Sequence, residues 1–249
     1  TPMFFDQQIH FASRDQKILV DLHKMTEGHL DATIMVAYLE QQGLTDEDLL
    51  TATAKADRIL NEIEAMVAKS SQFVNIAYTP TDLYRLKAER KKAIMLGIEN
   101  GYAIGKDLQN VERFRNRGVV YMTLCHNGNN QLCGSCRFND EGLGVNAFGE
   151  EVIHEMNRVG MMVDISHAGD QTFYDALDIS TKPIVASHSS SRSLCNHPRN
   201  LTDEQLKALA IKGGVAQVTL YNGFLKEEGE ATIQDAIAHL NHMVDVMGI

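Results

Sequence analysis

The 249-residue sequence contains no tryptophan, only four prolines and only four cysteines. Four cysteines are too few for a disulfide framework in a chain of this size, which excludes the small disulfide-rich domains. No apolar run approaches the roughly 20 residues that a membrane-spanning helix needs. We therefore expect no membrane-spanning segment in this chain, and the sequence does not indicate a compartment.

Positive charge is also scarce. The formal net charge is -10, and the short run from Arg85 to Lys92 is the local exception. Such a chain would repel phosphate backbones, so nucleic acid is not an expected partner. What the sequence does have is 44% hydrophobic residues and 18 glycines, a composition typical of a soluble globular fold with many short turns.

Apolar runs of strand length alternate with helical patterns from about residue 30 onward. The predicted strands are Ala32–Tyr38, Lys92–Ile98, Val119–Leu124, MMVDIS at 161–166, PIVAS at 183–187 and VAQVTLY at 215–221. The predicted helices begin near Thr45, Thr81, Leu108, Glu150, Gln171, Thr202 and Thr232. Repeated β-α units require a parallel sheet with helices outside it, either doubly wound or closed into a barrel. No linker divides the chain, so we predict an α/β fold with a single domain over residues 1–249.

Unusual polar residues follow these strands at their C-terminal ends, where parallel α/β sheets place their chemistry. The strand ends carry Glu99, His126, His167 and His188, and the last strand adds Tyr221. Taken singly, a histidine at a strand end is more often a hydrogen-bonded structural residue. Together, converging carboxylate and imidazole groups are the ligand set of a catalytic zinc or similar site.

Other motifs are weaker. The C-G-S-C pair at 133–136 suits a redox pair or half of a zinc site, but no second pair completes it, so we interpret it as a loop. The pattern H-E-x-x-H fails at Arg158, which leaves His154 and Glu155 on a surface helix. The serines of SHSSSRS at 187–193 suggest a Ser-His pair, but they lack a G-x-S-x-G elbow, and we expect them to cap the next helix.

The ordered stretches LGIENG, LCHN, GLGVNAFGEEVIHEMNRVGMMVDISH, ASHSS and PRN resemble the membrane (renal) dipeptidase family, zinc metallopeptidases of the amidohydrolase superfamily. The resemblance covers nearly the whole chain, from DLHKMTEGHLDA to the last helix. It implies a closed TIM-like (β/α)8 barrel and the hydrolysis of dipeptides, with some members accepting a D-residue at the C-terminal position. Homodimers occur in the family, which makes a second copy of this chain a candidate partner.

The resemblance also implies roles for individual residues. Glu99 matches the glutamate that bridges two zinc ions, and His167 and His188 match the two histidines on one of those ions. His126 matches a catalytic histidine that faces the substrate near the scissile carbonyl. Arg199 matches the arginine that binds the free carboxylate of the substrate.

Such a site has a physical rationale. Two cations that share a carboxylate lower the pKa of a bridging water, and the resulting hydroxide attacks the peptide carbonyl. His126 would donate to the developing oxyanion, and the guanidinium fork of Arg199 would select dipeptides over longer chains. Tyr221 is expected near the bound substrate by analogy.

The chain departs from the family pattern at both ends. The family has a His-x-Asp pair at the end of the first barrel strand, whereas this chain opens with TPMFF, which resembles the residues just after that pair. The family also has an aspartate at the end of the eighth strand, and this chain stops at VMGI, where that strand would begin. We therefore expect a segment of a longer enzyme that lacks the first and eighth strands. The alternatives are another hydrolase of the superfamily and a non-catalytic barrel fragment with half a site.

Overall fold

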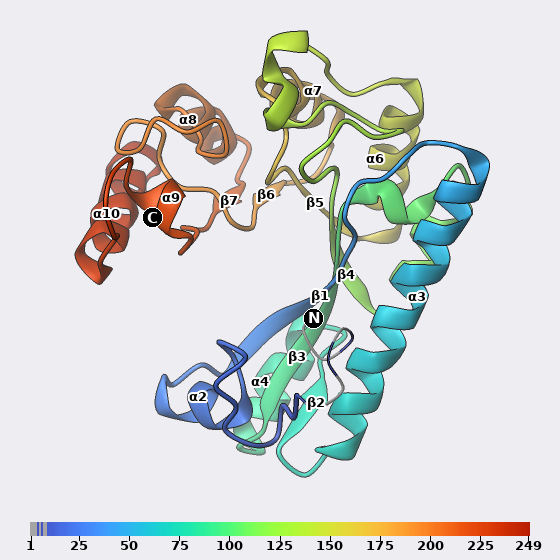
Figure 1. Ribbon diagram of the computed structural model, residues 1–249, viewed down its shortest axis with the longest axis vertical. Coiled ribbons are helices and arrows are strands. Elements are labelled where there is room, and N and C mark those ends of the chain that lie inside the picture. The colour runs from blue at the N-terminus through green and yellow to red at the C-terminus, as the bar shows by residue number, and fades with distance from the viewer. Residues whose placement is uncertain (1–3, 5, 7–8) are drawn as a thin grey trace.

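A computed structural model describes residues 4, 6 and 9–249. The expected segment TPMFF lies outside the described residues apart from Phe4. In the described part of the chain, seven strands form one parallel sheet in the order β1-β3-β4-β5-β6-β7, with β2 also paired to β3 (Figure 1). The strands are β1 (Ala32–Tyr38), β2 (Val74–Ile76), β3 (Lys92–Glu99), β4 (Val119–Thr123), β5 (Met162–Asp164), β6 (Val185–Ala186) and β7 (Val215–Ala216).

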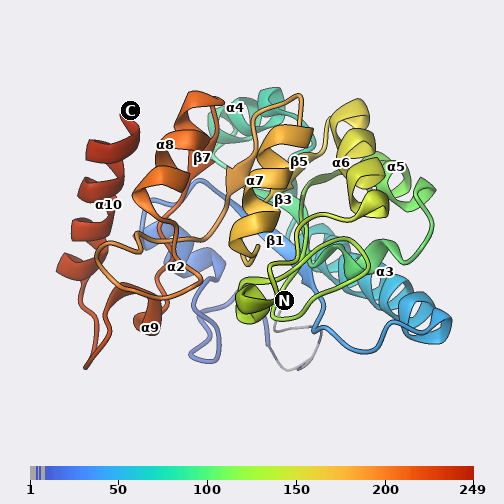
Figure 2. The ribbon, with the colours of Figure 1, turned by 90° about the horizontal axis from the view of Figure 1, so that it is seen from above.

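Helices connect these strands and cover the outside of the sheet. The α-helices are α2 (Leu22–Glu27), α3 (Asp46–Lys69), α4 (Pro80–Ala88), α5 (Gln109–Asn116), α6 (Ala147–Val159), α7 (Asp170–Ile179), α8 (Asp203–Ile211), α9 (Asn222–Leu225) and α10 (Ile233–Met247). Two 3₁₀ segments follow β3 and β4, namely η1 (Gly101–Ile104) and η2 (Cys136–Glu141). Figure 2 shows α10, α8, α7, α6, α5 and α3 following one another in an arc along the outer side of the sheet.

The predicted fold class is confirmed. Each strand runs parallel to its neighbour and is followed by a helix on the outside, which is the repeating unit of a TIM-like barrel. The observed sheet is open, with β1 and β7 as its two edges. The chain thus forms a parallel half-barrel sheet covered by helices.

All six predicted strands are present, but the later ones are shorter than predicted. The predicted strand at 215–221 is observed only as Val215–Ala216, and MMVDIS gives only Met162–Asp164. The physical reason is that the chain leaves the ladder where its polar residues find side-chain partners, as Ser166 and Ser187 do around Asp164. Strand β2 was not predicted, because three residues are too few to show a period.

Capping explains where the long helices begin. Thr45 forms a capping box with Asp48 at the start of α3, and Thr202 forms one with Gln205 at the start of α8. These reciprocal bonds satisfy amide groups that have no partner inside a helix. Helix α6 begins three residues before the predicted Glu150, because Asn146 caps it. At the other end of α6, Gly160 has a φ of 74°, the left-handed conformation that favours glycine.

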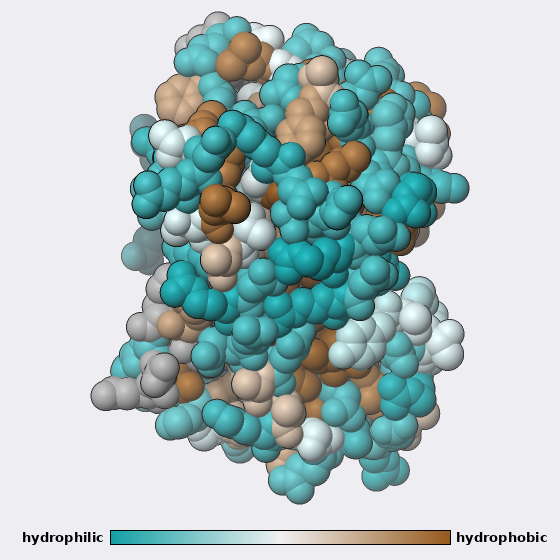
Figure 3. All heavy atoms as spheres, turned by 90° about the vertical axis from the view of Figure 1, so that its right-hand side faces the viewer, coloured by the Kyte–Doolittle hydropathy of each residue, from teal (hydrophilic) through white to brown (hydrophobic). Residues whose placement is uncertain are grey.

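One large hydrophobic cluster fills the space between the sheet and the helices, with buried members from Ile9 to Met243. In β3, Ile94, Leu96 and Ile98 lie on one face and are fully buried. Burying each such side chain contributes about 1.5–3 kcal/mol. Ala93 and Gly97 on the other face are buried as well, as expected for a parallel strand that is covered on both faces. The face turned to the viewer in Figure 3 carries mostly hydrophilic residues. Among the described residues, no helix is both long and apolar enough to cross a membrane.

Candidate metal centre

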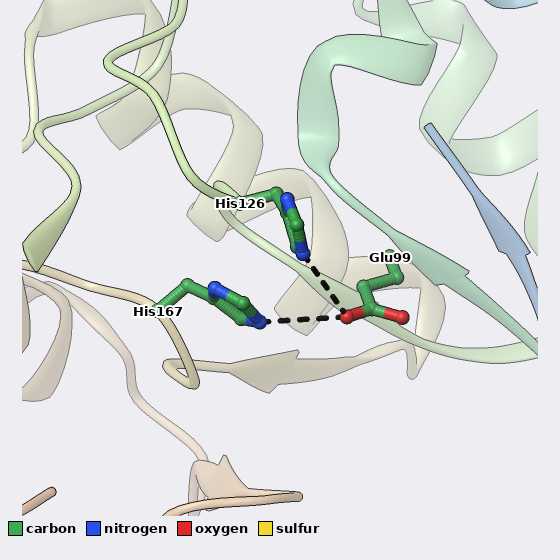
Figure 4. A group of neighbouring side chains, drawn as sticks. All are labelled: Glu99, His126 and His167. Carbon is green, nitrogen blue, oxygen red and sulfur yellow. Dashed lines mark ion pairs between the residues drawn. The ribbon is translucent and has the colours of Figure 1, made fainter. Parts of the chain in front are cut away.

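Four predicted site residues converge at the C-terminal edge of the sheet. Glu99 is the last residue of β3, and His126, His167 and His188 follow β4, β5 and β6. The Nε2 atoms of His167 and His188 each lie 3.4 Å from Oε1 of Glu99, and Nε2 of His126 lies 3.7 Å from the same oxygen. Figure 4 shows His126 and His167 pointing toward that single carboxylate oxygen. Three imidazole nitrogens and a carboxylate oxygen thus face one point.

The backbone is strained at two residues of the centre or next to it. His167 has a φ of 70° and Asn100, which follows Glu99, has a φ of 97°. Non-glycine residues in this region cost on the order of 1–3 kcal/mol and persist only where the surroundings hold them. Asn100 is held by hydrogen bonds from its Nδ2 to the carbonyl oxygen of Leu39 and to Oε1 of Gln41, each 3.1 Å long. This strain is a further sign of a functional site.

Burial and mutual contacts set the charges in the centre. Burial would by itself raise the pKa of Glu99, but its close contacts with the imidazole rings of His167 and His188 hold that pKa well below its ordinary value. Burial lowers the pKa of His167 to about 3 and also lowers the pKa of His126. At neutral pH the centre therefore holds an ionised carboxylate beside neutral imidazoles, the protonation state that binds metal ions.

Within the described part of the chain, Glu99, His126 and His167 form a group whose ligand atoms all lie within 4.8 Å of one another. His188 joins it, because its Nε2 lies 3.0 Å from Nε2 of His167. Carboxylate oxygen and imidazole nitrogen are the ligands that zinc accepts in catalytic sites. The donor set therefore fits a divalent cation such as zinc.

Sequence reasoning missed Asp164, the buried last residue of β5. Its carboxylate accepts hydrogen bonds from the hydroxyl groups of Thr123 and Ser187, both 2.6 Å long. It also accepts from the backbone N–H groups of Ser166 and Ser187, at 3.1 and 2.9 Å. The signal that could have revealed it is a charged residue inside the apolar run MMVDIS.

The second ring nitrogen, Nδ1, of His167 and of His188 also has a hydrogen-bond partner. Nδ1 of His167 lies 3.0 Å from Oδ1 of Asn127, and Nδ1 of His188 lies 2.7 Å from Oγ of Ser187. The prediction that the serines of SHSSSRS at 187–193 cap the next helix was wrong, because Thr202 caps α8 and the first of these serines, Ser187, binds Asp164 instead.

Arg199 lies in the loop between β6 and α8 and is only 5% exposed. Its Nη2 donates to the carbonyl oxygen of His188 at 2.9 Å, and its Nε atom is buried without a partner in the described structure. The guanidinium carbon lies 5.4 Å from the ring centre of Phe224. Tyr221 is 63% exposed, and its ring packs against that of Phe224 at 4.7 Å between centroids.

Of the weaker motifs, the C-G-S-C loop contacts this centre, because the N–H of Cys136 donates to the carbonyl oxygen of His167 at 2.8 Å. His154 is on the exposed surface of α6, 3.6 Å from Oε1 of Glu150, as the failed H-E-x-x-H pattern predicted. All four cysteines are buried free thiols. Burial raises the pKa of the Cys136 thiol to about 11, which keeps it protonated and unreactive at neutral pH.

Comparison with known proteins agrees with the fold and shows the family. The chain matches the membrane dipeptidase family (peptidase family M19) over residues 1–249. An uncharacterized dipeptidase of Schizosaccharomyces pombe is 35% identical over an alignment of 241 residues that covers 92% of this chain and 58% of that protein. The chain thus spans little more than half the length of that curated relative.

Solved structures share the fold. An amidohydrolase from Pseudomonas aeruginosa is 28% identical with a TM-score of 0.83, over 95% of this chain and 68% of that one. A metallopeptidase from Rhodobacter sphaeroides, solved with a phosphinate mimic of the dipeptide L-Ala-D-Ala, has a TM-score of 0.90 at 21% identity, over 99% of this chain and 80% of that one.

Proposed function

Because the chain belongs to the membrane dipeptidase family, we propose that it is the metal-binding part of a zinc-dependent dipeptidase. The observation that carries the proposal is the convergence of three Nε2 atoms on one oxygen of Glu99, at 3.4–3.7 Å. The continuous core from Ile9 to Met243 supports a single domain over residues 1–249. Homodimerisation stays a prediction that sedimentation of the purified chain would test.

Glu99, His167 and His188 would hold the metal, and the complete enzyme would bind two zinc ions per site. When bound, zinc polarises a carbonyl group and lowers the pKa of a water molecule to about 7. The strained backbone of His167 aims its ring at Glu99, and burial keeps that ring neutral and able to bind. Both features leave the ligand atoms in place before a metal ion arrives.

His126 would act on the substrate. Its ring packs edge-on against Tyr38 at 4.8 Å and tilted against His167 at 4.1 Å, between ring centres. Burial lowers the pKa of His126, so its imidazole is neutral at pH 7 and carries one N–H donor. A fixed donor next to the scissile carbonyl stabilises the negative charge that develops on its oxygen.

Arg199 would bind the terminal carboxylate of a dipeptide. Its unpartnered Nε–H is a buried donor, and such a donor is satisfied by an anionic acceptor. The Rhodobacter sphaeroides structure with a phosphinate mimic of L-Ala-D-Ala supports a dipeptide as the substrate class. Tyr221 stays a weaker candidate, because its contact is with Phe224 rather than with the four converging residues.

The test is to load the 249-residue chain with zinc, remove loose ion, and measure bound zinc together with hydrolysis of a set of dipeptides. Glu99→Gln should lose most of the zinc and reduce hydrolysis by more than the roughly 100-fold that the loss of a hydrogen bond to a metal ligand costs, while the metal-free chain stays folded. His154→Gln, on exposed α6, should keep both properties. A Glu99→Gln variant that retains zinc and activity would contradict the proposal.

Arg199→Lys tests the substrate class. One ammonium group cannot reproduce the guanidinium fork, so KM for a dipeptide should rise about 10-fold or more. A dipeptide amide, which lacks the terminal carboxylate, should be a poor substrate for both proteins. Equal hydrolysis of the acid and the amide by the unmodified chain would instead favour another hydrolase of the superfamily.

A further inference from the structure

The Asp164 carboxylate has every acceptor position filled. Two hydroxyl groups donate to Oδ2, from Thr123 and Ser187, and two backbone N–H groups donate to Oδ1, from Ser166 and Ser187. A carboxylate offers about four lone-pair positions, so four donors leave no place for a proton of its own. In this position Asp164 acts only as an acceptor.

The acceptor role of Asp164 fixes the direction of the hydrogen bond between Ser187 and His188. Because Ser187 gives its single hydroxyl hydrogen to Asp164, its oxygen can only accept from His188. The 2.7 Å contact between Oγ of Ser187 and Nδ1 of His188 therefore carries its hydrogen on Nδ1. A neutral imidazole with Nδ1–H has its lone pair on Nε2, and that nitrogen lies 3.4 Å from Oε1 of Glu99.

We infer that Asp164 is a positioning residue for the metal centre, acting through Ser187 to hold His188 in the tautomer and orientation that present Nε2 as a ligand. The inference rests on the proposed function. Asp164 lies at the end of β5, Thr123 at the end of β4 and Ser187 just after β6, so this one carboxylate joins three adjacent strand ends.

His167 shows the same arrangement with a weaker partner. Its Nδ1 lies 3.0 Å from the amide oxygen of Asn127, which makes Nδ1 the donor and Nε2 the lone-pair nitrogen. The two Nε2 atoms of His167 and His188 then face each other at 3.0 Å with no hydrogen between them. Two lone pairs at that distance repel unless a cation lies beside them. The hydrogen bonds at Nδ1 of both histidines therefore prepare the centre for a metal ion.

Asp164→Asn tests the directions of the hydrogen bonds that link Asp164, Ser187 and His188, because it changes the volume of the side chain very little. The two backbone N–H groups cannot reverse, so the amide oxygen has to face them and the amide NH₂ has to face the hydroxyl groups. Ser187 then accepts from Asn and donates to Nδ1 of His188, which moves the hydrogen of His188 to Nε2. The variant should therefore place a hydrogen where the metal ion binds.

The first measurement is the tautomer of His188 in the metal-free 249-residue chain, from nitrogen-15 NMR shifts of its ring. The expected result is protonated Nδ1 in the unmodified chain and protonated Nε2 in Asp164→Asn. Protonated Nε2 in the unmodified chain would overturn the inference. This readout needs no bound metal and no catalysis, so it decides on Asp164 even if the proposed function fails.

The second measurement is zinc affinity, by competition with a coloured chelator. Asp164→Asn should bind zinc about 10- to 100-fold more weakly, and Ser187→Ala should weaken binding in the same direction. Ser187→Thr, which keeps the hydroxyl, should restore it. Thr123→Val removes a hydroxyl that binds Asp164 but does not reach His188, so it serves as the matched control.

The outcomes separate the two hypotheses. Unchanged zinc affinity in Asp164→Asn, or an equal loss in Thr123→Val, would overturn the positioning role. Absence of zinc binding in the unmodified chain would overturn the proposed function instead, while the tautomer of His188 would still decide on Asp164.

Discussion

The two halves of the sheet are built differently. In the first half, β1, β3 and β4 are seven, eight and five residues long, and β1 and β3 pair over seven consecutive positions. In the second half, β5, β6 and β7 have three, two and two residues, and β5 meets β6 at a single pair, Asp164 and Val185. Backbone ladders organise the first half, and the second half depends more on side chains.

The difference bears on the metal centre because each half supplies part of it. Glu99 is itself in the ladder, paired with Tyr38 on one side and Thr123 on the other. His167 and His188 lie beyond the short strands, where the hydrogen bonds of Asp164 hold the backbone. Substitutions should therefore act through packing in the first half and through single polar side chains in the second.

The largest expected effect is in the first half. Ile94 is fully buried in β3 and is paired with Thr33 of β1 and Ile76 of β2. Ile94→Ala should lower the free energy of unfolding of the metal-free chain by about 3–4 kcal/mol, because it leaves a cavity between well-packed layers. Urea unfolding would measure this loss.

Val185 in β6 provides the matched comparison, because it is only half-buried in a two-residue strand. Val185→Ala should cost about 1 kcal/mol. If the two substitutions lowered the free energy of unfolding equally, packing would support both halves of the sheet alike, and the proposed difference between the halves would be wrong.

A polar side chain should matter most in the second half. Asn200 is fully buried, accepts from the N–H of Ser190, and donates to the carbonyl oxygens of Cys195 and Phe224, at 2.9–3.1 Å. Asn200→Ala leaves the N–H of Ser190 and the carbonyl oxygen of Phe224 without these partners, whereas the carbonyl oxygen of Cys195 still accepts from the N–H of His197. The free energy of unfolding should therefore fall by about 2–3 kcal/mol. The same substitution at exposed Asn241 of α10 should have almost no effect. A loss below about 0.5 kcal/mol at Asn200 would show that water replaces its bonds.

The parts of the fold that could be predicted are those with a local signal. The apolar runs Ala32–Tyr38 and Lys92–Ile98 gave strands with almost the observed bounds, because each is a continuous apolar run of strand length. Thr45 and Thr202 marked two helix starts correctly, since a capping box needs only four consecutive residues.

Of the site, only the residues at the C-terminal ends of predicted strands could be predicted from the sequence. Glu99, His126, His167 and His188 were expected at one edge because parallel strand ends meet there, and the structure brings them together. The role of Asp164 could not be predicted, because its partners come from three different strands. The lengths of β5–β7 were missed for the same reason, since contacts between distant residues end those strands.

The smallest expected effect compares two ion pairs at equivalent positions. Asp203 is the first residue of α8, and its Oδ1 lies 2.8 Å from Nε2 of His242 in α10. Asp46 is the first residue of α3 and pairs with Lys106 at 2.6 Å. Both carboxylates meet the same helix dipole, but the Asp203 pair is about 30% exposed or less on each side, whereas the Asp46 pair is mostly exposed.

The hydrogen bond from His242 lowers the pKa of Asp203 below its ordinary value, with a further contribution from Ser193 against the effect of burial. A carboxylate whose folded pKa is depressed stabilises the fold above its unfolded pKa of 3.8, and this stability is lost as the pH falls through the folded value. Asp203→Asn should therefore cost about 0.5 kcal/mol at pH 7, a figure kept small by solvent screening, and the difference from the unmodified chain should shrink below about pH 4. Asp46→Asn should cost less at every pH, because water screens its pair more fully. Thermal unfolding at a series of pH values would measure both, and a difference for Asp203→Asn that grows as the pH falls below about 4 would contradict the sign argued here.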